Sequence, residues 1–176
     1  MKALLFSTIR KGGVCKMRKD PHMELLNTLL VETFNEILKV EEQSLRLATQ
    51  GTVTVTEIHT LDAIGAEEPR TITELAAATM VTVSTMTIAV NRLATKGLVE
   101  RVRDTEDRRI VRVRLTHPGE VLVRAHQRFH RRMTAQVAEQ LSPEELEVLA
   151  GAMNRLRDFF KNENKQAGLN TDFTPE

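Results

Sequence analysis

Three things are scarce in this sequence of 176 residues: cysteine, long apolar runs and net charge. The single cysteine, Cys15, excludes an intramolecular disulfide and any zinc module held by several cysteines. No apolar run approaches the ~20 residues that a transmembrane helix needs, so we expect no membrane partner and a cytoplasmic protein. The formal net charge is +1, so no overall excess of charge indicates a partner.

Motifs of catalysis are missing as well. The sequence has no glycine-rich phosphate loop, no nucleophile elbow and no pair of carboxylates in a context that forms a cleft. We therefore expect neither an enzyme nor a bound cofactor. Hydrophobic residues make up 41% and charged residues 28% of the chain, which is typical of an ordinary globular protein.

Charge is nevertheless concentrated in one part of the chain. Between Arg101 and Arg132, ten arginines stand against four acidic residues. A local basic stripe on a nearly neutral chain is typical of a surface that meets nucleic acid.

Hydrophobic periodicity and capping motifs predict a mostly helical chain. Apolar residues at helical spacing predict a long helix over residues 23–49. Two short helices should follow, because Thr54-Val-Thr-Glu57 and Thr71-Ile-Thr-Glu74 both have the capping-box spacing, a hydroxyl three residues before a glutamate.

The second half of the chain predicts a third short helix, a hairpin and two long helices. Gly97 closes the short helix, and alternation at period two over residues 98–103 and 110–115 predicts a β-hairpin. Long helices should begin at Thr116 and at Ser142. The expected organisation is a disordered leader over residues 1–22, a domain over 23–163 with residues 54–115 between helices 23–49 and 116–163, and a flexible tail over 164–176.

A short helix, a tight turn and a capped second helix form the helix-turn-helix arrangement, whose second helix enters the DNA major groove. In that helix Val83, Met86, Val90 and Leu93 can pack inward. The outward face offers hydrogen-bonding groups, one arginine and no acid, as a negatively charged groove requires. We call it the recognition face, and its residues are Ser84, Thr85, Thr87, Ile88, Asn91 and Arg92.

Each type of side chain on the recognition face has a partner in DNA. Arg92 can bond guanine or a phosphate, Asn91 can bond adenine, and the methyl groups of Thr85, Thr87 and Ile88 can meet thymine methyls. An ordinary exposed helix rich in β-branched residues would look similar, so this segment alone leaves both interpretations open.

The hairpin favours the DNA-binding interpretation. Arg108 and Arg109 stand at its tip, where guanidinium groups can enter the minor groove beside the recognition helix. We expect Asp107 to orient one of them through a carboxylate–guanidinium fork. A solvated hairpin with surface ion pairs would explain the charges but not their place beside a helix-turn-helix. Four more arginines are expected to line one face of the hairpin toward the phosphates: Arg101, Arg103, Arg112 and Arg114.

Residues 80–119 resemble the winged helix-turn-helix of the MarR (multiple antibiotic resistance regulator) family. The motifs that carry the resemblance are Asp107-Arg108-Arg109, Lys96-Gly97 before the first strand, and Leu115-Thr116 followed by Gly119. The likeness extends over residues 23–160. Within the family the chain is most similar to the FabT-type repressors of fatty-acid synthesis, through Val40–Arg46, Thr56–Gly65 and His126–Met133.

The resemblance implies a mostly α (α+β) fold with long dimerisation helices and one β-hairpin wing. It also implies a homodimeric transcription repressor on a pseudo-palindromic operator in double-stranded DNA. In the FabT-type branch, acyl carrier protein with a long acyl chain acts as corepressor.

The residues allow such an effector independently. An acidic carrier protein could dock on one basic face of the helix that follows the hairpin, and an acyl chain could lie among apolar side chains. Ordinary core packing and solvated surface arginines would explain the same pattern. The candidate effector residues are Arg124, Arg128 and Arg131 for the carrier, and Phe34, Ile37, Leu38, Phe129 and Met133 for the chain.

A metal sensor is the alternative, together with a regulator that binds a small aromatic ligand. His126 and His130 share a helix face at i, i+4, and with His59, Glu41 or Glu42 they could assemble a zinc site. Histidines on an apolar stripe also serve as core residues. Peroxide sensing by a thiol is not favoured, because the only cysteine lies in the expected leader.

Overall fold

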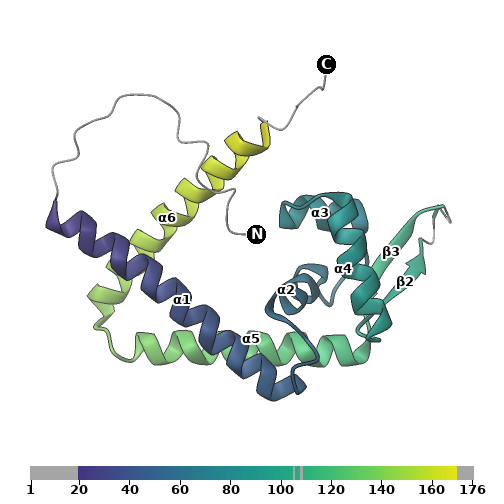
Figure 1. Cartoon of the computed structure of the whole chain (residues 1–176), viewed down its shortest axis with the longest axis horizontal. Helices are drawn as coiled ribbons and strands as arrows, with labels where there is room; N and C mark the ends of the chain where they lie inside the picture. The colour runs from purple at the N-terminus through teal and green to yellow at the C-terminus, as the bar shows by residue number, and fades with distance from the viewer. Residues whose placement is uncertain (1–19, 105, 108, 170–176) are drawn as a thin grey trace. The chain divides into compact units, whose positions relative to one another are not determined.

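The structure is a computed structural model of the chain, and it describes residues 20–104, 106–107 and 109–169 (Figure 1). Residues 1–19, most of the expected leader, and Arg108 lie outside the described residues. The chain divides into two compact units, residues 1–59 and residues 60–176.

The first unit is dominated by helix α1, Pro21–Thr49. Asp20 caps it by accepting a hydrogen bond from the backbone N–H of His22 at 2.9 Å, and proline occupies the first turn, where no backbone donor is needed. The helix begins two residues before the expected start at Met23. It ends at Gln50, whose left-handed backbone (φ 53°) lets its N–H bond the Arg46 carbonyl.

Helix α2, Val55–Ile64, begins in the first unit and continues into the second. Its capping box is formed as predicted. The N–H of Thr54 donates to Glu57 Oε2 at 2.9 Å, and the N–H of Glu57 donates to Thr54 Oγ1 at 3.3 Å.

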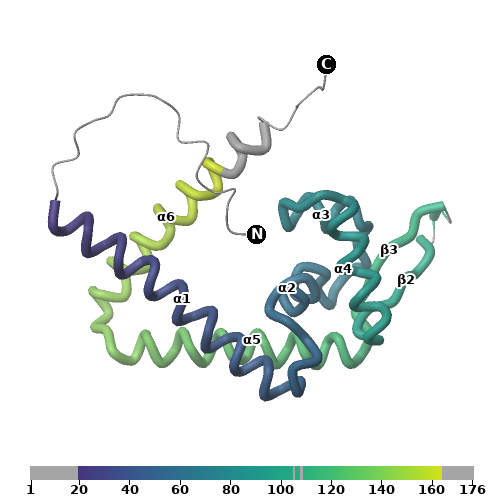
Figure 2. The backbone as a smooth tube through the Cα atoms, viewed as in Figure 1, coloured from purple at the N-terminus to yellow at the C-terminus, as the bar shows by residue number. Residues whose placement is uncertain are grey.

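The second unit contains a three-stranded antiparallel sheet of order β1-β3-β2, with helices before and after it. Its fully buried side chains include Leu61, Leu75, Leu93 and Val113. Figure 2 shows the backbone passing from α4 into β2, returning through β3 and continuing into α5. The elements are β1 Arg70–Thr71, α3 Ile72–Thr79, α4 Val83–Thr95, β2 Val99–Arg103, β3 Val111–Leu115, α5 His117–Ala138 and α6 Pro143–Leu169.

Local sequence fixes the junction between α4 and the hairpin. Gly97 takes a left-handed backbone (φ +69°) and donates its N–H to the Ala94 carbonyl at 2.9 Å, while the N–H of Leu98 donates to the Leu93 carbonyl at 3.0 Å. These two bonds form a Schellman motif, which confirms Gly97 as the residue that closes the helix. The hairpin therefore starts at a defined angle from α4.

Helix α5 is anchored to the same junction. Thr116 caps the helix and also donates its hydroxyl to the Gly97 carbonyl at 2.7 Å. Gly119 lies so close to the backbone of Leu98 that an added Cβ would overlap the Leu98 carbonyl oxygen. A side chain larger than hydrogen is therefore excluded at the point where α5 crosses the start of β2.

Three features differ from the sequence expectation. Strand β1 was not predicted, because two residues are too few to show alternation. The buried face of α5 runs through Gly119, Val123 and His126. Helical periodicity of apolar residues in the sequence instead predicts a buried stripe, and its members are half-buried or exposed: Leu122, Ala125, Phe129, Met133 and Val137. Helix α6 continues to Leu169, six residues past the expected end of the domain.

No single helix among the described residues is both long and apolar enough to cross a membrane. One bent pair, α3 with α4, meets the length and composition test only when the two helices are taken together across a bend of 110°.

Candidate nucleic-acid interface

Helix α4 begins with a cluster of hydroxyl groups. Thr82 caps the helix by accepting from the backbone N–H of Thr85 at 3.2 Å. Its Oγ1 lies 2.9 Å from Ser84 Oγ and 2.8 Å from Thr85 Oγ1. The first turn therefore presents both hydroxyl groups and the positive end of a helix dipole, a combination that suits a phosphate oxygen.

The two faces of α4 separate largely as predicted. Met86, Val90 and Leu93 are buried. Val83 is 49% exposed, so its expected inward packing was wrong. It is the first residue of the helix, one turn before the part of α4 that enters the core.

The recognition face is accessible, as an element that reads DNA must be. Ser84, Thr85, Ile88, Asn91 and Arg92 are exposed, and Ile88 reaches 54%. Thr87 is half-buried and donates its hydroxyl to the Val83 carbonyl at 2.7 Å, which leaves its methyl group as the feature available for contact.

Asn91 is bonded to the hairpin. Arg101 Nη2 on β2 donates to Asn91 Oδ1 at 2.6 Å. The carboxamide oxygen is thus engaged, and the side chain offers its NH₂ donors outward. A two-bond contact with adenine needs both the oxygen and the NH₂ group, so Arg101 would have to release Asn91 for that contact.

The hairpin tip is held by side chains that bond the backbone. Asp107 Oδ1 accepts from the backbone N–H of Arg109 at 2.9 Å, and the Asp107 carbonyl accepts from the N–H of Ile110 at 2.9 Å. These bonds give Asp107 a role in shaping the turn. The expected carboxylate–guanidinium fork with Arg108 involves a residue that the structure does not describe, so it stays a prediction. Arg109 is exposed, and Arg108 lies outside the described residues.

Asp104 braces the same turn and was missed from sequence. Its Oδ1 accepts from the backbone N–H groups of Glu106 and Asp107 at 2.8 and 3.1 Å, while Oδ2 accepts from Arg112 Nε. The hydrogen bond from Arg112, followed by the two backbone bonds, lowers the pKa of Asp104 from 3.8 to about 2. The sequence did contain a signal for this role, because an aspartate commonly accepts a hydrogen bond from the backbone N–H two residues later and so begins a turn.

Arg112 joins the hairpin to the preceding strand and helix. Besides its bond to Asp104, it donates from Nη1 to the Pro69 carbonyl at 3.4 Å and lies 3.8 Å from Glu74 Oε2. The Asp104 carboxylate raises the pKa of Arg112, so its charge is fixed at all physiological pH values. Arg112 is therefore a structural cross-link at the base of the tip.

The strand register corrects the expectation that four arginines line one face. Arg101 and Arg103 stand opposite Val113 and Val111, whereas Arg112 stands opposite Val102. Directly opposed residues project to the same side of a sheet, so arginines 101 and 103 lie on one face and arginines 112 and 114 on the other. The second pair is also engaged with acids, since Arg114 Nε donates to Glu100 at 2.7 Å.

Comparison with known proteins agrees with this geometry. The model of the MarR family matches residues 52–110, which cover α2 through the tip of the hairpin. The crystal structure of Streptococcus pneumoniae FabT in complex with DNA is 34% identical, covers 80% of this chain and 98% of its own, and has a TM-score of 0.76. The chain belongs to the MarR family. It is a DNA-binding transcription regulator with a winged helix-turn-helix, in which the β2–β3 hairpin and its turn, residues 99–115, are the wing.

Two other solved regulators show the same fold at lower identity. Staphylococcus aureus MepR in complex with DNA is 25% identical over 75% of this chain and 94% of its own, with a TM-score of 0.62. The transcriptional regulator BldR from Sulfolobus solfataricus is 29% identical over 81% and 99%, with a TM-score of 0.57. No curated protein matches the sequence.

The candidate effector residues of this MarR-family chain lie on α1 and α5. On α1, Phe34 is 63% exposed, Ile37 is exposed and Leu38 is half-buried. On α5, Phe129 and Met133 are half-buried, and the three basic residues, Arg124, Arg128 and Arg131, are exposed.

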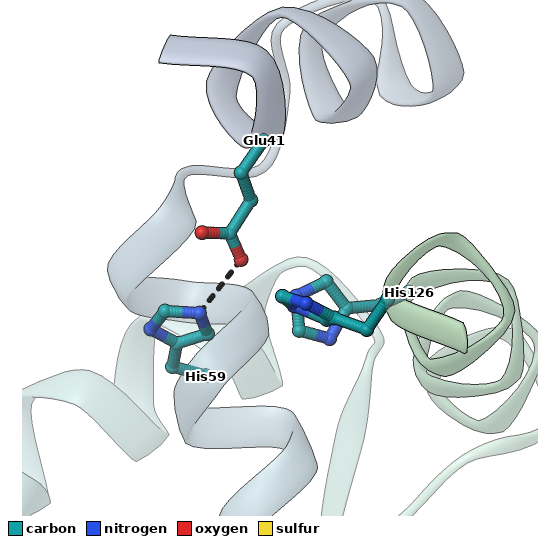
Figure 3. Close-up of side chains that lie close together, drawn as sticks. Glu41, His59 and His126 are labelled. Carbon is teal, nitrogen blue, oxygen red and sulfur yellow. Dashed lines mark hydrogen bonds and ion pairs between the residues drawn. The ribbon is translucent and has the colours of Figure 1, made fainter. Parts of the chain in front are cut away.

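The metal-binding candidates form a close pair within each unit. In the first, Glu41 is 3% exposed and its Oε1 lies 2.7 Å from His59 Nε2 (Figure 3). In the second, His126 and His130 on α5 bring their Nε2 atoms to 3.0 Å from each other.

Proposed function

We propose that this protein is a transcription repressor that places α4 in the major groove and the tip of the wing in the adjacent minor groove. The observation that carries the proposal is the exposed, acid-free recognition face beside an arginine at a turn that Asp104 and Asp107 hold. Hydroxyl, amide and guanidinium donors on the helix suit the major groove, and an exposed arginine on a narrow tip suits the minor groove.

The test is fluorescence anisotropy with operator DNA selected from a random pool. Arg109→Ala should reduce affinity by roughly 5- to 150-fold, because a desolvated arginine contact in a groove contributes about 1–3 kcal/mol. Arg132→Ala, an exposed arginine on α5, is the matched control and should change affinity little. Equal affinities of the two variants would contradict insertion of the wing.

We propose further that the repressor is a homodimer joined through its first and last two helices. Support comes from the apolar side chains that α1 and α6 leave exposed in the single chain, because large exposed apolar surfaces mark interaction sites. A second copy related by a two-fold axis would place two recognition helices on a pseudo-palindromic operator. The residues are Leu25, Leu26, Leu29, Leu30 and Val31 on α1, and Leu149, Met153, Phe159 and Phe160 on α6.

Light scattering coupled to size-exclusion chromatography measures the oligomeric state. The native chain should elute with twice the mass of one chain, 19.9 kDa, and Phe160→Asp should shift the population toward monomer. Met80→Asp is the charge control, because Met80 is a 69% exposed apolar residue at the end of α3, outside the first and last two helices, and this variant should leave the dimer intact. A native chain that is monomeric at micromolar concentration would contradict the proposal.

We propose finally that the regulated genes serve fatty-acid synthesis and that long-chain acyl carrier protein is the corepressor. Support comes from the 34% identity to FabT and from the exposed basic face of Arg124, Arg128 and Arg131, which suits an acidic carrier. Operator affinity should rise when the acyl-loaded carrier is added and stay unchanged with the carrier that lacks an acyl chain. Arg128→Glu should abolish the rise without changing the affinity measured in the absence of carrier.

A further inference from the structure

Two imidazole rings meet on one turn of α5. His126 and His130 are four residues apart, so the helix places both on one side. Their Nε2 atoms are 3.0 Å apart, and their rings cross at 89° with centroids 4.5 Å apart. His126 is only 8% exposed and His130 is half-buried, so the pair is held by its surroundings.

The separation of the two nitrogens matches one edge of a metal coordination shell. Zinc binds imidazole nitrogen at about 2.0–2.1 Å in a tetrahedron, which places two nitrogen ligands roughly 3.3 Å apart. The observed 3.0 Å differs from this by a few tenths of an ångström, which small side-chain rotations can supply. Both histidines approach each other through the same ring atom, Nε2, which is the arrangement in which Nδ1 is the ring atom that can make the outer hydrogen bond of a metal ligand.

We propose that His126 and His130 bind one divalent transition-metal ion through their Nε2 atoms, with water or carboxylate oxygen in the remaining positions. Two imidazoles suit Zn²⁺, Co²⁺, Ni²⁺ or Cu²⁺, whereas Mg²⁺ and Ca²⁺ prefer oxygen. The competing explanation is a hydrogen bond in which one ring donates to the other, because 3.0 Å also fits an N–H···N bond. The two explanations differ in whether added metal binds.

Helix α5 links the histidine pair to the DNA-binding surface. Helix α5 begins two residues after β3 ends, and its cap Thr116 and its Gly119 both contact the α4–β2 junction. An ion bound across one turn would stiffen this helix where it passes from the wing into the rest of the second unit. This regulatory role rests on the proposed function, whereas the binding of the ion does not.

The experiment titrates Zn²⁺ into the full chain after removal of metal with a chelator, followed by calorimetry. One ion per chain should bind, and His126→Gln and His130→Gln should each weaken binding by at least about tenfold. His117→Gln is the matched control, since His117 lies on the same helix, is exposed and is outside the pair. Co²⁺ should give the visible absorption bands of a tetrahedral site in the native chain and in the His117 variant only.

A thermal melt supplies a second readout. Zn²⁺ should raise the Tm of the native chain, because a ligand that binds only the folded state stabilises it, and the same Zn²⁺ concentration should raise the Tm of the His130 variant less. His130 is the half-buried member, so this variant tests the proposal even if loss of the buried His126 ring prevents folding. Absence of zinc binding by the native chain, or equal binding by native and His130 variant chains, would overturn the proposal.

Operator binding measured in chelator separates the two proposals. Loss of zinc binding with DNA binding intact would overturn the metal site alone. Failure of the chain to bind any selected DNA, while zinc still binds, would contradict the proposed function alone.

Discussion

Replacement of Gly119 by alanine tests how α5 is anchored to the wing. An added Cβ would overlap the carbonyl oxygen of Leu98 and lie 3.1 Å from its carbonyl carbon. Both are backbone atoms at the start of β2, so no side-chain rotation can relieve the overlap. Either α5 or the strand must shift, and overpacking of this kind costs typically 1–3 kcal/mol, with a rigid backbone neighbour at the upper end.

Alanine also stabilises a helix relative to glycine, by roughly 0.5–1 kcal/mol. The net loss should therefore be about 2 kcal/mol. For a chain of this length, 1 kcal/mol corresponds to roughly 2–4 °C, so the Tm of Gly119→Ala should fall by about 4–8 °C. Differential scanning calorimetry at one fixed protein concentration measures the change, because oligomers have concentration-dependent melting.

Gly151 provides a matched control in α6. An alanine Cβ there would meet only the end of the Arg155 side chain, at 3.7 Å, so the gain in helix propensity is unopposed. Gly151→Ala should raise the Tm slightly, whereas Gly119→Ala should lower it. If both variants gained stability, Gly119 could not be in close contact with the Leu98 backbone. That result would refute the proposal that this contact fixes α5 against the wing.

Three further predictions concern the wing and the recognition face. Because the pKa of Asp104 is lowered to about 2, its hydrogen bonds to the turn should be complete above about pH 4 and lost as the pH falls toward 2. NMR of the Asp107 backbone amide would follow this loss, and Asp104→Asn should remove the pH dependence and weaken operator binding. Arg101→Ala should change base preference only while Asn91 is present, because it releases the Asn91 oxygen, and a double-mutant cycle with Asn91→Ala measures this coupling. Operator affinity of the native chain should fall steeply with salt, at about −0.9 per neutralised phosphate on a log–log scale, and a flat line would indicate a partner other than DNA.

Local signals predicted most of the helices correctly. The capping boxes at Thr71 and Ser142 form with both of their bonds, as the one at Thr54 does, because a hydroxyl and a glutamate three residues apart need only the first turn of their own helix. Gly97 closes α4 for the same reason: a left-handed backbone is a local requirement. Such features depend on sequence neighbours alone.

Features that depend on distant partners were missed or misplaced. Strand β1 exists because Arg70 and Thr71 pair with Val113 and Arg112, more than 40 residues later. The inward face of α5 passes through Val123 and His126 because Gly119 packs on the Leu98 backbone, which sets the rotation of the whole helix. Periodicity finds a helix but does not fix its rotation when apolar residues lie on more than one side.

For the candidate site, the sequence predicted which side of α4 is exposed but not which side of the hairpin each arginine occupies. The exposed residues of the recognition face follow from helical spacing, since the buried positions Met86, Val90 and Leu93 leave only one side outward. We expected arginines 101, 103, 112 and 114 to form one basic face of the hairpin. The antiparallel register instead places the first two on one side of the sheet and the last two on the other. Whether an arginine faces DNA or an internal acid depends on its partner across the sheet, and for Arg112 that partner is Asp104.

The proposed contact of the wing with DNA gives its acidic residues a use. Asp104 directs its carboxylate at two backbone N–H groups of the turn and at Arg112, which compensates its charge within the protein, and Asp107 accepts from the backbone N–H of Arg109. These bonds restrain the described residues of the turn before any binding, and ordering a backbone residue otherwise costs about 1–2 kcal/mol on binding. An exposed arginine such as Arg109, on a turn preorganised in this way, can therefore contribute more affinity than an arginine on a loop that must be ordered first.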